Sequence, residues 1–207
     1  MTTQPSIACE INANVVETTH AKHESKANLR RTLLAARAGL PGDVRTGLDT
    51  AIADNLRAYL RRSPAQSLGV FWPIRGEPDL RKLYAELAAA GMALALPVMT
   101  GRQAPLCFAA WAPGAAVTLD RWGLATPVDT LLVTPQVLLV PCLGFNAQGF
   151  RLGYGGGFYD RTLALLPRPR TIGIAYTIAQ AAFAADAHDI ALDVVLTDLI
   201  QRDCRDR

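Results

Sequence analysis

The sequence predicts an α/β fold, an open sheet flanked by helices on both faces. Segments of strand composition alternate with amphipathic helical segments over most of the 207 residues. The most apolar segments, such as 137–142, are continuous hydrophobic runs typical of strands that are buried on both faces. Hydrophobic residues make up 50% of the chain, which is enough for one sizeable core. We therefore expect residues 26–207 to form a single domain.

Residues 1–25 differ from the rest of the chain. They form a polar extension of mixed charge with no arginine and no long apolar block. This composition fits neither a secretory signal nor a transit peptide. We expect a flexible lead-in to the domain.

Four helices are expected, at 26–40, 43–62, 79–90 and 157–166. In the first, apolar residues recur at spacings of four, three and four: Leu29, Leu33, Ala36 and Leu40. Ser25 is a suitable N-cap for this helix, and the Pro-Gly pair at 41–42 ends it. A glycine at position 91 closes the third helix and a proline at 167 stops the fourth.

Strands are expected at 67–72, 92–98, 106–111, 137–142, 171–176 and 194–197. Ligands of open α/β sheets bind at the carboxyl ends of the strands. The segments that follow 67–72, 137–142 and 171–176 are therefore expected to meet at a site.

Composition argues against several classes of function. A net charge of +3 is too small to predict nucleic-acid binding, and no apolar run reaches the roughly 18 residues of a membrane helix. The four cysteines lie far apart without a zinc or redox spacing, which favours a reduced, cytoplasmic setting. The histidines and serines lack the sequence context of a hydrolase or metalloprotease.

The most informative segment is GFRLGYGGGFYDR, residues 149–161, which contains five glycines. Glycines let the backbone approach a bulky anion, and the start of a helix offers unpaired N–H groups. The segment matches neither the Walker A motif nor the dinucleotide fingerprint, and a glycine cluster alone also fits a turn without a ligand. The flanking Arg151 and Asp160 favour a phosphate-binding loop, because a plain turn needs neither a cation nor a potential Mg²⁺ ligand.

Three further groups of polar residues have both a functional and an ordinary interpretation. Lys26 and Arg30 lie one turn apart on the first helix, where they could bind an anion together or simply form a solvent-exposed edge of the helix. Glu77 precedes a helix start, a position that the helix dipole alone favours for a carboxylate. Asp189 and Asp193 precede a strand, where carboxylates usually belong to a polar turn, although one of them could complete a metal site with Asp160.

Taken together, these residues resemble the 5-formyltetrahydrofolate cyclo-ligase family, also called 5,10-methenyltetrahydrofolate synthetases. The resemblance covers about residues 26–198 and has five parts in order. They are the Lys-x-x-x-Arg helix start at 26–30, the strand and Glu turn with Trp72 and Glu77, the Trp-Gly-Leu-x-x-Pro segment at 122–127, the sequence RLGYGGGFYDR at 151–161, and the His-Asp and Leu-Asp pairs at 188–193.

The resemblance implies a fold similar to that of ribose-phosphate isomerases and CoA transferases. It also implies ATP- and Mg²⁺-dependent cyclisation of 5-formyltetrahydrofolate to 5,10-methenyltetrahydrofolate by a cytoplasmic monomer with no nucleic-acid or membrane partner. The implied ATP-binding residues are Lys26, Arg30, Arg151, Leu152, Gly153, Tyr154, Gly155, Gly156, Gly157, Phe158 and Tyr159. Trp72, Glu77 and Tyr154 would contact the folate, and Asp160 and Asp189 would hold Mg²⁺. No general base is expected, because phosphate activates the formyl group.

Two other classes of function remain open from the sequence. A catalytically idle relative would bind ATP or folate without releasing ADP. A phosphosugar enzyme would share the fold, but it would need a carboxylate base aimed at a carbon and no ATP, which fits Arg151 and Asp160 less well.

Overall fold

The computed structural model describes residues 25–121 and 123–204. An eight-stranded sheet, in the order β12-β11-β10-β7-β1-β2-β3-β6, forms its centre. The five strands from β11 to β2 are mutually parallel, and β12, β3 and β6 pair antiparallel at the two sides. The strands are β1 (Ser67–Gly69), β2 (Ala93–Met99), β3 (Leu106–Trp111), β6 (Leu132–Val133), β7 (Val137–Pro141), β10 (Arg170–Ile174), β11 (Val194–Leu196) and β12 (Gln201–Asp203).

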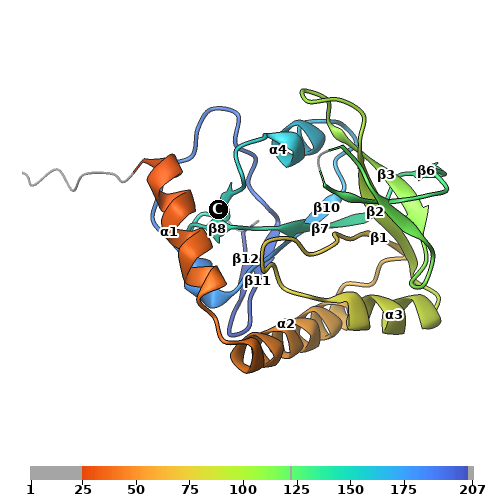
Figure 1. Ribbon diagram of the computed structural model, residues 1–207, viewed down its shortest axis with the longest axis horizontal. Coiled ribbons are helices and arrows are strands. Elements are labelled where there is room, and N and C mark those ends of the chain that lie inside the picture. The colour runs from red at the N-terminus through yellow and green to blue at the C-terminus, as the bar shows by residue number, and fades with distance from the viewer. Residues whose placement is uncertain (1–24, 122, 205–207) are drawn as a thin grey trace, which may run out of the picture.

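Helices cover both faces of this sheet, as the sequence predicts. Helices α2 (Gly42–Arg62) and α3 (Arg81–Ala89) run along one face, and the short α4 (Phe158–Leu163) lies over the other (Figure 1). One apolar core joins α2 and α3 to side chains such as Leu68 and Leu139, and a second core joins Leu163 of α4 to Leu138 and Val195. Alternate residues of β2, β7 and β11 therefore enter opposite cores, which explains why these three strands are apolar throughout.

Helix α1 (Lys26–Ala38) packs at the side of the sheet against a two-stranded hairpin, β8 (Gly144–Phe145) and β9 (Arg151–Leu152) (Figure 1). Ser25 caps the helix as expected, accepting a hydrogen bond from the backbone N–H of Asn28. The approach is close: a Cβ on Gly144 would lie 2.6 Å from Leu33 Cδ1. A glycine at this position therefore lets α1 reach the hairpin, and the hairpin carries the glycine-rich loop.

Three expected helices are shorter than the sequence suggested, and the one expected at 79–90 spans only Arg81–Ala89. The helix expected at 157–166 ends at Leu163, because Leu166 precedes a proline and its backbone is disfavoured in the helical region. The first helix ends at Ala38 because Gly39, a poor helix former, is its C-cap.

Several short elements were not expected at all. They are β6, β8, β9 and β12, the separate hairpin of β4 (Val117–Leu119) and β5 (Ala125–Pro127), and the 3₁₀ turn η1 (Thr177–Ala179). The expectation of a flexible extension falls on residues that, apart from Ser25, lie outside the described part of the chain. No helix of the described segments is both long and apolar enough to cross a membrane.

Candidate functional site

The glycine-rich loop occupies residues 153–157, between β9 and α4. Gly155 and Gly157 have φ values of 94° and 66°, in the left-handed region that disfavours other residues. Gly157 is the N-cap of α4 and makes no side-chain capping bond. The loop thus takes a path that only glycine adopts without strain, next to helical N–H groups that need partners.

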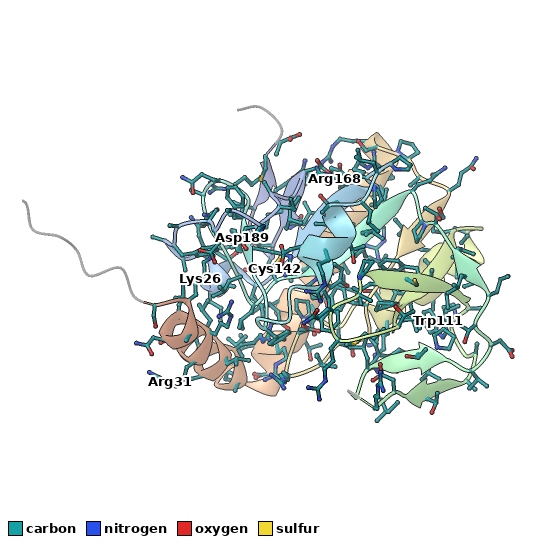
Figure 2. The ribbon with its side chains drawn as sticks, turned by 90° about the horizontal axis from the view of Figure 1, so that it is seen from above. Lys26, Arg31, Trp111, Cys142, Arg168 and Asp189 are labelled. Carbon is teal, nitrogen blue, oxygen red and sulfur yellow. The ribbon has the colours of Figure 1, made fainter. Side chains whose placement is uncertain are left out.

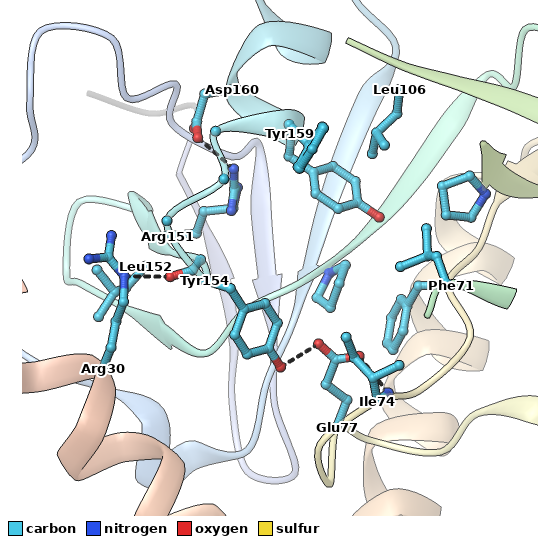
Figure 3. Close-up of a pocket in the computed structure, with 18 of the residues that line it drawn as sticks. Arg30, Phe71, Ile74, Glu77, Leu106, Arg151, Leu152, Tyr154, Tyr159 and Asp160 are labelled. Atoms are coloured by element: carbon cyan, nitrogen blue, oxygen red, sulfur yellow. Dashed lines mark hydrogen bonds and ion pairs between the residues drawn. The ribbon is translucent and has the colours of Figure 1, made fainter. Parts of the chain in front are cut away.

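Helix α1 places two cations against this loop. Arg30 Nε donates to the Gly153 carbonyl oxygen at 2.8 Å, and the Arg30 guanidinium lies beside Gly155 (Figure 3). Lys26, one turn earlier, lines the same cavity. The sequence interpretation of these residues as a solvated edge is therefore wrong for Arg30, which is bound to the loop.

Each carboxylate predicted to bind metal is paired with a cation predicted to bind phosphate. Arg151 Nη2 lies 2.7 Å from Asp160 Oδ2, and the two side chains are 5% and 21% exposed. Lys26 Nζ lies 2.6 Å from Asp189 Oδ2 and 2.7 Å from Asp186 Oδ2. Figure 3 shows the first pair beside the loop, and Figure 2 shows Lys26 and Asp189 in the same region. Both predicted metal ligands are thus held by cations of the same site.

The pairing shifts the pKa values of two of these groups. Burial acts to raise the pKa of Asp189, but the hydrogen bonds from Lys26 and from the Asp186 backbone outweigh it and lower the pKa. Burial likewise acts to lower the pKa of Lys26, and its two carboxylate partners reverse that effect and raise it. Both groups are therefore charged at neutral pH.

Glu77 lies deep in the opposite wall of the cavity. It is 3% exposed, its Oε1 accepts from the Tyr154 hydroxyl at 2.8 Å, and its Oε2 accepts from the Ile74 backbone N–H at 3.0 Å. Burial raises its pKa, and these hydrogen bonds with the nearby Arg37 and Arg75 oppose the rise. A buried carboxylate held in this way suits the recognition of N–H donors on a ligand.

One cavity of about 310 Å³ joins these features. Its size is in the range of small-molecule sites. Its apolar wall comes mainly from the segment that follows β1 and from the ends of β2 and β7. Trp72, which packs edge-on against Trp111 with ring centroids 5.9 Å apart, forms part of this wall. Every residue that the sequence analysis assigned to ATP, folate or Mg²⁺ lines this cavity: Lys26, Arg30, Trp72, Glu77, residues 151–160 and Asp189.

Some residues of the site were missed or interpreted differently. Asp186, which pairs with Lys26, had no distinguishing sequence pattern. Arg37, which donates through Nη2 to the Tyr154 hydroxyl, was also missed. Its signal was its position 11 residues after Lys26, about three helical turns, which puts both on one face of α1. Asp193 accepts from the backbone N–H and Oγ1 of Thr171 and belongs to the sheet, not to the cavity.

The donor set at this cavity fits Mg²⁺ only as part of a complex with phosphate. Within residues 25–121 and 123–204, no three His, Cys, Asp or Glu side chains are grouped as a metal site. Asp160 and Asp189 nevertheless line the same cavity as the glycine loop. Mg²⁺ is usually held by one or two carboxylates together with substrate phosphates and water, and this arrangement meets that requirement.

The chain is similar to one family of known proteins. Residues 22–198 match the model of the 5-formyltetrahydrofolate cyclo-ligase family. The chain is 32% identical to the 5-formyltetrahydrofolate cyclo-ligase of Mycolicibacterium smegmatis, over 84% of this chain and 93% of the relative. It is 28% identical to that of Mycoplasma pneumoniae, over 84% and 98%.

The fold is also similar to solved structures. The NMR structure of Aquifex aeolicus 5,10-methenyltetrahydrofolate synthetase superposes with a TM-score of 0.76 at 29% identity, covering 88% of this chain and 94% of that one. The synthetase from Mycoplasma pneumoniae superposes with a TM-score of 0.72 at 25% identity, covering 84% and 99%.

Proposed function

This chain belongs to the 5-formyltetrahydrofolate cyclo-ligase family, and on that premise we propose that its cavity converts 5-formyltetrahydrofolate and ATP to 5,10-methenyltetrahydrofolate, ADP and phosphate. One observation supports the assignment of this reaction to the cavity. Side chains from α1, the turn after β1, the glycine loop and the segment after η1 converge on a single cavity. We further propose that the protein acts in the cytoplasm as a monomer and that residues 26–207 are one domain.

The chemistry requires activation of a poor leaving group. The formyl oxygen attacks the γ-phosphorus of ATP, and ADP leaves. N10 of the folate then attacks the formyl carbon, its proton is lost to solvent, and the carbon–oxygen bond breaks with release of phosphate. The protein mainly has to align the two substrates and stabilise negative charge on the phosphoryl group.

The residues of the cavity suit these tasks. Backbone N–H groups of residues 153–157 would hold the phosphates, and Lys26, Arg30 and Arg151 would neutralise their charge. Glu77 would accept N–H groups of the folate ring, beside the wall that contains Trp72, and Tyr154 would lie between the two substrates. Asp160 and Asp189 would hold Mg²⁺, which would neutralise further charge on the triphosphate.

The pairs of cavity charges support this assignment. A guanidinium that is bound to Asp160 can exchange it for a phosphate oxygen, and the carboxylate it releases then has a metal to bind. The Arg151 Nε has no hydrogen-bond partner although it is buried. A buried donor without a partner costs about 1–3 kcal/mol, and a bound phosphate would remove that cost.

The direct test is formation of the methenyl product, followed by its near-ultraviolet absorbance, with purified protein, 5-formyltetrahydrofolate, ATP and Mg²⁺. Turnover requires all four components, and folded protein without turnover would refute the proposal. Binding of ATP without folate-dependent ADP release would instead identify an idle binding module.

Variants then test the assigned residues. Arg151→Ala and Asp160→Ala should each lower kcat/KM at least roughly tenfold, about 1.4 kcal/mol. Arg57→Ala is the matched control, because Arg57 forms an exposed ion pair on α2 with Asp54. Equal rates in all three variants would show that the loop does not act on the substrates.

A further inference from the structure

Arg37 is a buried cation that does not itself line the cavity. It lies in the last turn of α1 and is 4% exposed. Its Nη2 donates to the Tyr154 hydroxyl, and its Nε donates to the Arg75 carbonyl oxygen at 3.1 Å. Its Nη1 is buried without a partner. A buried guanidinium is costly unless a nearby negative charge compensates it.

That compensating charge reaches Arg37 through Tyr154. Arginine has no acceptor, so the Tyr154 oxygen must accept the bond from Arg37 and direct its own hydrogen elsewhere. The Tyr154 hydroxyl donates to Glu77 Oε1 at 2.8 Å (Figure 3). The hydrogen bonds therefore have one direction, from Arg37 to Tyr154 to Glu77, and they end on a carboxylate that can only accept.

These hydrogen bonds leave some acceptor positions of the Glu77 carboxylate unused. An ionised carboxylate has about four acceptor positions. The Tyr154 hydroxyl uses one on Oε1, and the Ile74 backbone N–H uses one on Oε2. One position on each oxygen remains, and Glu77 lines the cavity. Two adjacent N–H donors of a flat heterocycle match such a pair of acceptors.

Arg37 also contacts the turn that carries Glu77. Arg75 and Gly76 have φ values of 49° and 73°, and the Glu77 N–H donates to the Ile74 carbonyl oxygen at 3.0 Å. Two successive positive φ values are typical of a tight type I′ turn, and they are unfavourable for a residue such as arginine. The bond from Arg37 Nε to the Arg75 carbonyl oxygen holds this strained turn in place.

The same helix is bound to the nucleotide loop. Arg30 Nε donates to the carbonyl oxygen of Gly153, the residue before Tyr154. The Tyr154 ring also lies 5.8 Å from Arg37 Cζ and 5.2 Å from Arg75 Cζ. One side of α1 thus contacts the backbone next to Tyr154 and the hydroxyl of Tyr154 itself.

Given the proposed function, we infer that Arg37 is a positioning residue for folate binding. Through Tyr154 and the 74–77 turn it holds Glu77 with two acceptor positions open to the cavity. Tyr154 belongs to the glycine loop, so the same contacts connect the folate-binding carboxylate to the nucleotide site.

Four variants test the inference, with dissociation constants for 5-formyltetrahydrofolate measured by calorimetry in the absence of nucleotide. Arg37→Met removes the charge at similar length, and Arg37→Lys keeps the charge but cannot make both hydrogen bonds. Tyr154→Phe keeps the ring and removes the hydroxyl. Arg31→Met is the matched control, because Arg31 is exposed on the same helix and, within the described residues, its side chain hydrogen-bonds only to Asn28.

Arg37→Met and Tyr154→Phe should each weaken folate binding roughly tenfold, consistent with loss of a hydrogen bond to a charged group. Arg37→Lys should recover part of the loss, and Arg31→Met should bind as the wild type does. The decisive measurement is the double variant of Arg37→Met with Tyr154→Phe. If Arg37 acts through Tyr154, the double variant binds at most about threefold more weakly than either single variant. Independent roles would make it roughly tenfold weaker than either single variant, or roughly a hundredfold weaker than the wild type.

Two controls separate this inference from its alternatives. If Arg37 acts on the folate side of the cavity, the affinity for a non-hydrolysable ATP analogue with Mg²⁺ should fall by less than about threefold in Arg37→Met. General misfolding would instead weaken the binding of folate and of nucleotide equally. If Arg37→Met does not fold, Arg37→Lys combined with Tyr154→Phe provides the same cycle. Wild-type folate affinity in the Arg37 variants, or multiplied effects in the double variant, would overturn the inference even when the wild type turns over. Absence of turnover in the wild type would overturn the proposed function instead.

Discussion

Substitution of Asp160 by asparagine should destabilise the fold measurably, although Asp160 lies at a ligand site. The Arg151 Nη2 to Asp160 Oδ2 distance is 2.7 Å, and Arg151 is only 5% exposed. Removal of one partner from a buried pair costs about 3–5 kcal/mol, because it leaves an uncompensated charge. Asp160 itself is 21% exposed, so solvent screening reduces this to about 2–3 kcal/mol. For a chain of this size the melting temperature should fall by about 4–12 °C.

The assay is reversible thermal unfolding followed by circular dichroism, with Asp54→Asn as the control. Asp54 forms an ion pair with Arg57, but its side chain is 64% exposed. Exposed pairs of this kind contribute about 0–1 kcal/mol, so the control should melt close to the wild type. Equal melting temperatures for the two variants would refute the view that Asp160 compensates a buried guanidinium.

A second arm of the experiment adds ATP with a chelator in place of Mg²⁺. In Asp160→Asn the triphosphate supplies the negative charge that Arg151 lacks, and in the wild type it meets the Asp160 carboxylate without a metal between them. ATP alone should therefore raise the melting temperature of the variant more than that of the wild type, in proportion to its affinity for each folded form. A larger rise for the wild type would contradict the proposed exchange of partners.

Three smaller effects should accompany these. Gly155→Ala should lower the unfolding free energy by roughly 1–2 kcal/mol because the φ of Gly155 is 94°. Gly47, which is exposed on helix α2, should instead raise it by about 0.5–1 kcal/mol when replaced by alanine. Chemical denaturation measures both changes, and equal changes would contradict the argument. Arg75→Asn should add up to about 1 kcal/mol by relieving its positive φ, and a loss in the same assay would show that its contacts outweigh the strain. Burial raises the pKa of Glu77, so its carboxylate takes up a proton and loses an acceptor position as pH falls through that raised value. Folate affinity should therefore decline toward acid pH, while Glu77→Gln should bind weakly at every pH; a similar acid decline in Glu77→Gln would assign it to another group.

The long elements of this fold could be predicted because their periodicity is strong. The apolar spacing in α1 and the continuous run of β7 both appear in the structure within a few residues of their expected bounds. The strands of two or three residues could not be predicted, because so short a segment has no measurable period. Hairpin β8–β9 is the important case: it puts Arg151 in a strand, so the loop itself is confined to residues 153–157.

The membership of the site could be predicted more fully than its interactions. Residue type and local order, together with the resemblance to the cyclo-ligase family, predicted which side chains would bind phosphate, folate or metal, and the cavity gathers these side chains. Which cation lies against which carboxylate depends on how α1 docks on the hairpin, and no local pattern contains that information. Arg37 was missed for the same reason, since its two partners belong to segments 38 and 117 residues away.

Burial explains why the cavity has this organisation. A site for a triphosphate and a metal ion needs several cations and carboxylates close together, and each would be costly to bury alone. Before ligands bind, Arg151 is paired with Asp160, Lys26 with Asp189, and Arg37 with Glu77 through Tyr154. Under the proposed function, the metal and the nucleotide arriving together would let the first two pairs exchange partners without leaving a charge unpaired. The third pair would stay in place and keep an acceptor open for the folate, so the charge pairs that stabilise the cavity before binding would also prepare it for both substrates.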